Sequence, residues 1–599
     1  MADSGLKQKL PIGIQNFEDI RRNDYLYIDK TAYIYELIQN GKPYFLSRPR
    51  RFGKSLLVST MKAYFEGRSE LFDDLDIYEL SKDDPDAFVP HPVFYFDFNG
   101  ADYSAIKDMS DEDESRISSV MYGVDVDSIG DESDDINDII NHIQFKTPEG
   151  SRIPVLPVEQ IIDEHLRNWE DVYGSDPRNK TLPSRFRYLI RTAVERTGRK
   201  AVVLVDEYDK ALLEENPVID DLNRLAYKAF FGVLKSYDEY LKFIFITGVT
   251  NFHGWKWECP EGHGCPSIPE FSKVSIFSDL NQLEDISLDD AYAGICGITE
   301  QEIRDNLSSE VKDLASRRNF TADECYRRLR DMYDGYHFSE ECEGVYNPFS
   351  LLNCLKKKKF GSYWFETGTP TFLIRKLTET GFDVKRITEQ EIYANEKKLS
   401  DYRNDSNDPV PLLYQTGYLT IIDYDEEFDS YLLDYPNDEV RYGFLESLVP
   451  MILNDSDSKT TALDIRSFGQ DIKKGDTDGF KKRLTALYAS LPYYEGKQNS
   501  SDDYLERDFQ NVIYITFMLL GQFIRTQVHN SVGRADAIVE TADFVWIFEF
   551  KRDKTAEEAL AQIDEKGYAL PFAADSRTLI KIGVNFSSHT RNIDGWVVV

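Results

Sequence analysis

The chain of 599 residues contains only 6 cysteines and no long uninterrupted hydrophobic run. So few cysteines in so long a chain exclude the dense disulfide framework of a small secreted protein. The longest apolar stretch, Val512 to Ile524, is interrupted by Thr516, Gly521 and Gln522 and is shorter than the roughly 18 residues of a membrane-spanning helix. The N-terminal segment lacks the hydrophobic core of a secretion signal. We therefore expect a cytoplasmic protein without a membrane partner.

Basic residues are also scarce, with 70 Lys and Arg against 106 Asp and Glu, which gives a formal net charge of -36. A chain with this charge repels a polyanion as a whole. A nucleic-acid site would therefore have to be a local basic groove or a metal site. Two dense acidic clusters lie at 111–114 and 131–135. We interpret the stretch around them as a solvated insertion, with a regulatory tail as the alternative.

Apolar residues make up 41% of the chain and aromatic residues 13%, which excludes a disordered or fibrous protein. Apolar runs at 44–47, 201–205 and 243–246 predict strands, and the pattern from Ser184 to Thr197 predicts a helix. Continuous apolar strands that alternate with helices are typical of a parallel sheet covered on both faces. Residues 1–290 are therefore predicted to form a doubly wound α/β domain.

The remaining chain predicts two further regions and a connection. Residues 291–450 are expected to form a helical lid and a winged-helix-like region, with helices at 298–306, 321–332 and 411–418 and a hairpin at 419–424 and 431–433. Residues 451–479 are polar and are expected to be a loose linker. Residues 480–599 predict the order α-β-β-β-α-β, with helices at 479–491, 503–520 and 555–568 and strands at 523–530, 534–540, 544–551 and 578–586.

Gly53-Lys54-Ser55 lies between the first predicted strand and a helix, as in a P-loop. Backbone N–H groups and the helix N-terminus would hold the phosphates, Lys54 would reach the β- and γ-phosphates, and Ser55 would bind Mg²⁺. The full pattern has Gly where this chain has Arg48, so the motif is a variant. Arg48 and the residues that follow it make the loop basic and stiff. The loop residues expected to bind the nucleotide are Arg50, Arg51, Phe52, Gly53, Lys54 and Ser55.

Residues at the ends of two later predicted strands would complete a site for ATP and Mg²⁺. Asp206 would hold Mg²⁺ through water, and Glu207 would activate the attacking water. The alternative is a buried strand that ends in acidic residues for solubility. Thr247 would sense the γ-phosphate, although a threonine that only forms a turn fits that position equally well. Ligands bind at the carboxyl ends of strands in open α/β sheets, which favours the nucleotide site.

A second group of charged residues lies near the C-terminus. Glu549 and Lys551 share one face of a predicted strand, and a hairpin places Asp536 across from Glu549. Two carboxylates and a lysine suit metal-dependent cleavage of a phosphodiester bond, in which the carboxylates hold Mg²⁺ and the lysine positions water. Glu506 is a further metal-ligand candidate, and Gln562 could hydrogen-bond into the site. The alternative is a structural Lys–Glu pair in the core.

Further motifs give a resemblance that covers most of the chain. The segments 10–13, 27–31, 47–55, 205–210, 247–250, 333–336, 346–350, 367–370 and 436–441 resemble the AAA-ATPase-like family of uncharacterised bacterial proteins. Gly533 to Asp536, Glu549 to Lys551 and Gln562 to Tyr568 resemble the PD-(D/E)XK nuclease superfamily, whose fold is restriction-endonuclease-like. The family's phosphate loop also has Arg at the position of Arg48, so this residue is a family trait.

Two stretches depart from the family pattern, namely 101–153, which is acidic, and 253–270. The second contains Cys259, His263 and Cys265, which would leave a zinc site one ligand short. We therefore favour a loop with free thiols over a zinc site.

The sequence favours an ATPase with a Mg²⁺-dependent nuclease domain that binds DNA or RNA. We expect this protein to act in genome defence or mobile-element biology, although the resemblance itself does not assign a cellular role. The alternative is a nucleotide-controlled switch whose C-terminal domain binds nucleic acid or protein without cleavage. The sequence does not predict an oligomeric state.

Overall fold

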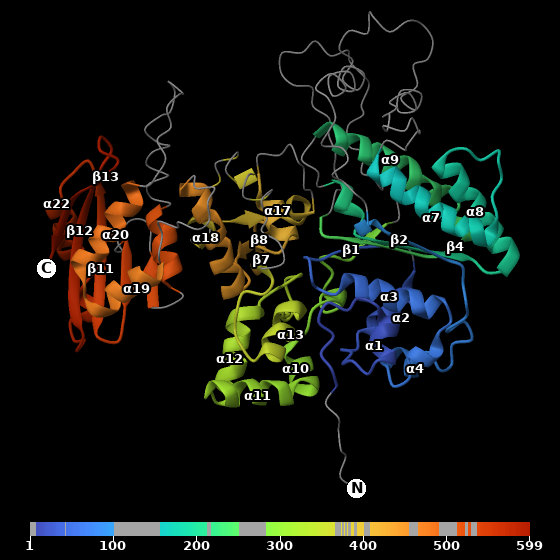
Figure 1. Cartoon of the computed structure of the whole chain (residues 1–599), viewed down its shortest axis with the longest axis horizontal. Coiled ribbons are helices and arrows are strands. Elements are labelled where there is room, and N and C mark those ends of the chain that lie inside the picture. Colours follow the sequence, from blue (N-terminus) through green and yellow to red (C-terminus); the bar gives the residue numbers. More distant parts are fainter. Residues whose placement is uncertain are drawn as a thin grey trace, which may run out of the picture. The chain divides into compact units, whose positions relative to one another are not determined.

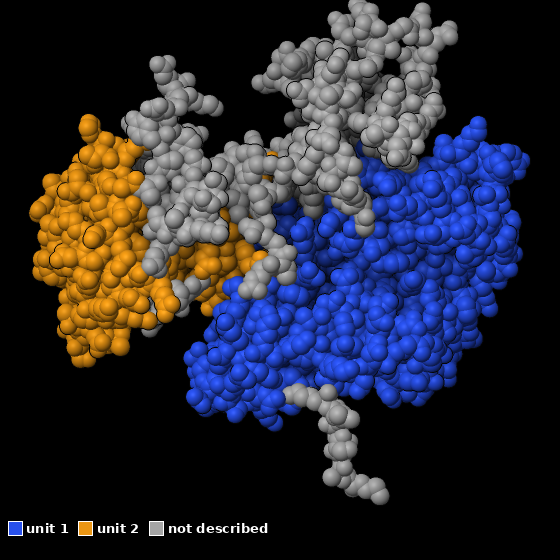
Figure 2. Space-filling model, viewed as in Figure 1, with its two compact units in different colours: residues 1–363, 393–431 blue, residues 364–392, 432–599 orange. Residues whose placement is uncertain are grey.

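The structure is a computed structural model that describes most of the chain as two compact units. Unit 1 comprises Met1–Tyr363 and Tyr393–Tyr431, and unit 2 comprises Trp364–Ile392 and Leu432–Val599 (Figure 2). The chain therefore passes between the units after residues 363, 392 and 431. The described residues are 8–41, 43–100, 156–212, 217–250, 283–365, 373, 376–377, 380, 382, 385–388, 392–400, 408–453, 465–489, 512–521, 525–528 and 536–599.

Unit 1 is built on a parallel sheet of five strands in the order β2-β3-β4-β1-β5. The apolar runs predicted as strands form β1, β3 and β4, and the sequence analysis missed β2 and β5. Because all five strands are parallel, their carboxyl ends share one edge of the sheet. The strands are β1 (Tyr44–Ser47), β2 (Val93–Asp97), β3 (Ala201–Asp206), β4 (Leu241–Gly248) and β5 (Glu284–Asp285).

Helices cover both faces of this sheet, as predicted (Figure 1). The rings of Phe94 and Phe96 contact Trp169, Phe186 and Phe230 on one face. That face is covered by α7 (Pro157–Tyr173), α8 (Leu182–Thr197) and α9 (Pro217–Ser236). The other face is covered by α3 (Lys54–Phe65), with α1 (Phe17–Arg22), α2 (Thr31–Asn40) and α4 (Asp76–Leu80) on the same side. Short 3-10 helices occur at η1 (Ser69–Leu71), η2 (Phe98–Gly100), η4 (Tyr208–Leu212), η5 (Asp238–Tyr240) and η6 (Asp290–Tyr292).

A cluster of helices with its own apolar core follows in unit 1. It consists of α10 (Glu300–Asn306), α11 (Ser308–Arg318), α12 (Ala322–Tyr333) and α13 (Pro348–Lys357). Leu314, Leu329 and Leu355 are fully buried in this core. The helices predicted at 298–306 and 321–332 are confirmed as α10 and α12.

Short helices and strands occupy residues 385–434, a range in which the chain passes between the units twice, after residues 392 and 431. The helix predicted at 411–418 is α17 (Val410–Gln415), and the predicted hairpin is β7 (Thr420–Asp425) with β8 (Ser430–Asp434). A third strand, β6 (Tyr393–Ala394), pairs with β8. The remaining elements are α15 (Lys385–Thr388) and α16 (Glu396–Leu399). The winged-helix-like character of this region stays a prediction.

Unit 2 contains a mixed sheet of five strands in the order β13-β12-β11-β10-β9. Only β11 and β12 pair in parallel, and the predicted β-β-β-α-β order is present. The sequence analysis missed β13, which pairs with β12. The strands are β9 (Arg525–Val528), β10 (Ala537–Glu540), β11 (Phe544–Arg552), β12 (Thr578–Ser587) and β13 (Asn592–Val598), and the helices include α18 (Asp438–Leu453), α20 (Thr477–Ala489), a helix at 512–520, α22 (Ala556–Glu565) and η8 (Leu570–Phe572).

The range 451–479, expected to be a loose linker, contains the amphipathic helix α19 (Ile465–Lys474). Phe468 and Ile472 are buried one turn apart, and Phe468 packs against Phe480 at a ring distance of 5.1 Å. Arg466, Gln470, Lys473 and Lys474 form the exposed side of the helix. Phe468 and Ile472, spaced one helical turn apart, form the apolar side on which the helix packs, so a helix forms although the range is mostly polar.

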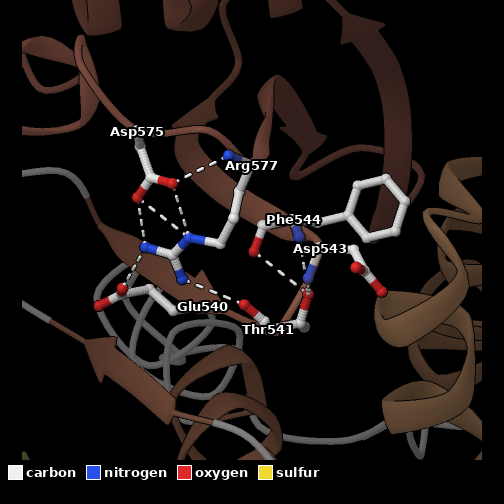
Figure 3. Close-up of polar contacts among 6 residues, drawn as sticks. All are labelled: Glu540, Thr541, Asp543, Phe544, Asp575 and Arg577. Atoms are coloured by element: carbon white, nitrogen blue, oxygen red, sulfur yellow. Dashed lines mark hydrogen bonds and ion pairs between the residues drawn. The ribbon is translucent and has the colours of Figure 1, made fainter.

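The turn between β10 and β11 is fixed by Arg577 (Figure 3). Its guanidinium donates hydrogen bonds to Asp575, to Glu540 and to the carbonyl of Thr541. The Thr541 hydroxyl accepts a hydrogen bond from the Phe544 N–H, which closes the turn. These contacts hold the hairpin in the register that pairs Ala537 with Phe548.

Candidate nucleotide and metal sites

The phosphate loop joins β1 to α3 in the predicted arrangement. Gly53 adopts a left-handed backbone with φ of 98°, which favours glycine, and α3 begins at Lys54. The first N–H groups of α3 have no intrahelical acceptor, so they are available to an anion. The buried Lys54 ammonium donates to the carbonyls of Arg48 at 2.9 Å and Pro49 at 3.2 Å. Lys54 must leave these carbonyls to reach a phosphate.

Arg48 is the loop residue whose environment differs most from the expectation of a basic phosphate loop. Its side chain is 1% exposed and donates to the carbonyls of Ser47, Ser287 and Tyr292. The guanidinium also lies 4.0 Å from the ring centre of Phe338. Burial lowers the pKa of Arg48. The cation therefore holds the start of the loop against neighbouring segments of unit 1.

Other loop side chains also contact the rest of unit 1. The ring of Phe52 is buried against Tyr336 at 4.7 Å. The Arg51 guanidinium lies 5.1 Å from the ring centre of Phe349, and Arg50 is exposed. Phe52 therefore offers only its backbone to a phosphate, whereas the side chains of Arg50 and Arg51 are exposed.

Asp206, at the end of β3, has the environment expected of a cation ligand. It is 1% exposed, and neither carboxylate oxygen accepts a hydrogen bond from a described residue. Burial raises its pKa to about 6, while the nearby Ser55 hydroxyl and Lys54 ammonium oppose that rise. An ionised, buried and unbonded carboxylate is costly unless a cation compensates it. Asp206 and Ser55 therefore fit a bound Mg²⁺.

Glu207 follows directly and has a left-handed backbone with φ of 50°. Such a conformation costs free energy in a residue with a side chain, and it often marks functional sites. The Glu207 carboxylate is partly exposed and lies 4.0 Å from the Lys210 ammonium. It is therefore accessible to a water molecule.

Asp209, two residues further on, is buried and structural. Its carboxylate accepts hydrogen bonds from the N–H groups of Val249 and Thr250 and from the Thr250 hydroxyl, at 2.6 to 3.0 Å. This contact ties the turn after β3 to the end of β4. Asp209 thus fixes the segment that carries Glu207.

The hydroxyl of Thr247 is already engaged, since it donates to the Leu46 carbonyl of β1 at 2.8 Å. Its role as a γ-phosphate sensor stays a prediction.

Asp97 was missed by the sequence analysis. It ends β2 in direct register with Asp206 and adds a second carboxylate to this edge of the sheet. The signal was present in the sequence, because Val93–Asp97 is an apolar run that ends in an acid, like the run that ends at Asp206.

In unit 2, the structure brings together Glu549, Lys551 and Gln562. Glu549 is 1% exposed; one of its oxygens accepts hydrogen bonds from the Lys551 ammonium, at 2.9 Å, and from the Gln562 amide. The other oxygen, Oε2, is buried and accepts no hydrogen bond from a described residue. Burial raises the pKa of Glu549, while Lys551 acts in the opposite direction. The unbonded oxygen fits a cation ligand.

Asp536 lies next to this group, directly before the strand β10 whose Ala537 pairs with Phe548. Its carboxylate accepts a hydrogen bond from the Phe550 N–H at 2.7 Å. The hairpin therefore places Asp536 beside Glu549, as predicted. The residues fit a divalent cation held by two carboxylates with Lys551 adjacent.

Several predicted features lie outside the described residues. They are Glu506, the acidic stretch 101–153 and the segment 253–270 with Cys259, His263 and Cys265. Within the described ranges, no group of three or more His, Cys, Asp or Glu side chains is arranged to hold a metal. In the same ranges, no helix combines the length and hydrophobicity needed to span a membrane.

Comparison with known proteins agrees with this geometry. The family described as "Predicted AAA-ATPase" matches residues 11–156 and 140–255, and the PD-(D/E)XK nuclease superfamily matches residues 505–596. An "Uncharacterized protein in vnfD 5'region" from Azotobacter chroococcum mcd 1 is 33% identical over 602 residues, which cover 99% of each chain. No solved structure matches. The chain thus belongs to the AAA-ATPase-like family and carries a C-terminal domain of the PD-(D/E)XK nuclease superfamily.

Proposed function

We propose that the chain hydrolyses ATP at the phosphate loop of unit 1 and cleaves phosphodiester bonds of DNA or RNA at the carboxylate site of unit 2. The observation that carries the proposal is the same at both sites. Asp206 and Glu549 are each 1% exposed and each presents a carboxylate oxygen without a hydrogen-bond donor among the described residues. Both matched families support catalysis of these two types.

At the nucleotide site, each residue has a distinct role. The N–H groups at the start of α3 bind phosphate oxygens, and Lys54 exchanges the loop carbonyls for the β- and γ-phosphates. Ser55 and Asp206 are the residues that would hold a Mg²⁺ ion, which would supply positive charge beside the phosphates. Glu207 orients the attacking water and accepts its proton.

At the carboxylate site, Asp536 and Glu549 are the residues that would hold a divalent cation; the predicted ligand Glu506 lies outside the described residues. The cation supplies charge stabilisation at the scissile phosphate. Lys551 orients water and offsets negative charge on the phosphate. Gln562 donates to Glu549 and thereby fixes which carboxylate oxygen remains for the cation. A role in genome defence or mobile-element biology stays a prediction.

The test at the nucleotide site compares Lys54→Ala with Glu207→Gln in the full chain. We expect Lys54→Ala to lose nucleotide affinity because the phosphates lose their cation. Glu207→Gln should still bind ATP but turn it over at least about 100-fold more slowly, since it removes the base. Lys82→Ala and Glu195→Gln, at exposed positions on unit 1, are the controls. Parental turnover by Lys54→Ala would refute the assignment.

The test at the carboxylate site uses Asp536→Asn and Glu549→Gln, with single- and double-stranded DNA and RNA as substrates. Mg²⁺- or Mn²⁺-dependent cleavage should disappear in both variants, whereas Glu565→Gln, at an exposed position on α22, should cleave normally. ATP turnover should persist, because the two sites lie in different units. If the parental chain cleaves none of these substrates with ATP and metal present, the chain is better described as a nucleotide-controlled switch.

A further inference from the structure

The helix cluster α10–α13 carries a basic surface on a strongly acidic chain. In the segments 308–330 and 354–360 basic residues outnumber acidic ones, although the whole chain has a net charge of -36. The surface, which we call the basic end of the cluster, consists of Arg317, Arg318, Lys356, Lys357 and Lys359. All five side chains are exposed.

Two helix ends meet at this surface. The Arg318 guanidinium, at the end of α11, donates to the carbonyl of Lys358, which follows α13, at 3.0 Å. The rings of Phe320 and Phe360, just beyond the same two helix ends, lie 6.4 Å apart. These contacts place the arginines of α11 beside the lysines of α13. The basic end is therefore one surface rather than two separate runs of charge.

The cations of the basic end are not neutralised by neighbouring acids. Among the described residues, none of the five forms an ion pair with a carboxylate. By contrast, Arg328 pairs with Glu324, and Lys358 lies 3.6 Å from Asp313. Basic residues are favoured near helix C-termini, which explains one or two cations at the end of α11 and at the end of α13. The run Lys356–Lys359 extends beyond the last turn of α13, which ends at Lys357.

We propose that the basic end of the helix cluster binds the phosphate backbone of a nucleic acid. This inference rests on the proposed nuclease function, since it supplies the local basic site that an acidic nucleic-acid enzyme requires. Charges further apart than about 10 Å are screened at moderate salt, so a local surface can attract phosphates despite the net charge of the chain. Phe320 and Phe360 pack against the core of the cluster between the two basic runs and hold these runs together, so the phosphate contacts fall to the exposed cations.

The test measures binding rather than cleavage. A fluorescently labelled oligonucleotide, single-stranded or duplex, is titrated with the full chain at several salt concentrations in the presence of EDTA. The test variant combines Lys356→Gln, Lys357→Gln and Lys359→Gln. The matched control combines Lys82→Gln, Lys180→Gln and Lys235→Gln, which are exposed and scattered over unit 1. Both triple variants change the net charge equally.

We expect the test variant to bind at least about tenfold more weakly and the slope of log Kd against log salt to fall by about two. The control should change the Kd by less than about twofold. Replacing the same three lysines by arginine should preserve binding, because the charge remains. Thermal unfolding of all variants confirms that they fold.

Equal weakening in the test and control variants would refute the proposal, because only net charge would then matter. Absence of binding by the parental chain would also refute it. Tighter binding of polyglutamate than of the oligonucleotide at equal charge would assign the surface to an acidic polypeptide and overturn the proposal. If binding depends on the three lysines but no variant cleaves, only the proposed nuclease activity fails.

Discussion

Arg48 has a different role in the structure from the role that the sequence predicts. In the sequence it adds positive charge to the phosphate loop. In the structure it is a buried anchor that donates to three carbonyls and lies over Phe338. No local pattern indicates this role, because the acceptors Ser287 and Tyr292 are far away in the chain. By contrast, the places of Lys54 and Ser55 at the start of α3 and of Asp206 at the end of β3 were predictable, because the motifs around them are local.

Asp334, in the helix cluster, allows a pH-dependent prediction at the residue scale. Burial raises its pKa to about 6, from an ordinary value of 3.8. Above pH 6 the folded state therefore holds an ionised carboxyl that the unfolded state solvates better. This penalty decreases as the pH falls from about 6 to about 4 and is absent below that range.

Asp334→Asn should therefore stabilise the chain by up to about 3 kcal/mol above pH 6 and have little effect near pH 4. The measurement is the free energy of unfolding of the variant and the parent at several pH values. Asp323→Asn, at an exposed position on α12, is the control. A gain that does not change with pH would show that charge at Asp334 is not the cause.

At the scale of elements, close packing of α22 on the sheet of unit 2 depends on Gly583. A Cβ at this position would lie 2.1 Å from the carbonyl oxygen of Ala556 and 2.6 Å from the Leu560 nitrogen. Both atoms belong to the helix backbone, so the helix would have to move. Gly583 pairs with Glu549 on β11, and α22 carries Gln562. The glycine therefore sets the distance between Gln562 and Glu549.

Gly583→Ala should destabilise the chain by about 3 kcal/mol or more, because it forces a steric overlap in a packed core. Cleavage should fall as well, since Gln562 would withdraw from Glu549. Thermal unfolding and cleavage rates measure the two effects. Gly361→Ala is the control, because the nearest atom to its added Cβ is 3.5 Å away. An unchanged melting temperature for Gly583→Ala would contradict the observed packing.

The elements that the sequence predicted well have strong local patterns. β3 and β4 are apolar almost throughout, and the hairpin β10–β11 contains an obvious polar turn. β5 is only two residues long and β13 is only partly buried, so neither has a distinctive pattern. Their places in the sheets depend on pairing with distant strands. Local hydrophobic patterns do not predict pairing between strands that are far apart in the chain.

At the scale of the whole molecule, the sequence predicted the AAA-ATPase-like and nuclease-like regions that the families match. Each compact unit consists of two separate segments, which no local pattern predicts. A boundary at 480 cuts through the first turn of α20 and separates the rest of this helix from α19, although Asp471 of α19 pairs with Arg483 of α20 at 2.6 Å. Phe468 also packs on Phe480. The polar composition of 451–479 indicated a linker and did not predict these contacts between α19 and α20.

A fragment of residues 465–599 should therefore unfold at a higher temperature than a fragment of residues 480–599. The shorter fragment exposes the faces of Phe480 and Arg483 that α19 covers. Circular dichroism during heating measures the difference. Phe468→Ala in the longer fragment should remove part of the gain, by about 3 kcal/mol. Identical melting of both fragments would show that α19 contributes nothing to the domain.

Because the chain passes between the units after residues 363, 392 and 431, a single recombination event between related genes cannot exchange unit 2 as a whole. Genes often acquire a C-terminal domain through one recombination event that replaces everything beyond a single point. Here an exchange at residue 431 would join Trp364–Ile392 from one parent to Leu432–Val599 from another. Trp364 and Glu439, which are hydrogen-bonded across these two segments, would then come from different parents. A hybrid with this exchange point should therefore be less stable than either parent, because unit 2 would be assembled from two unmatched segments.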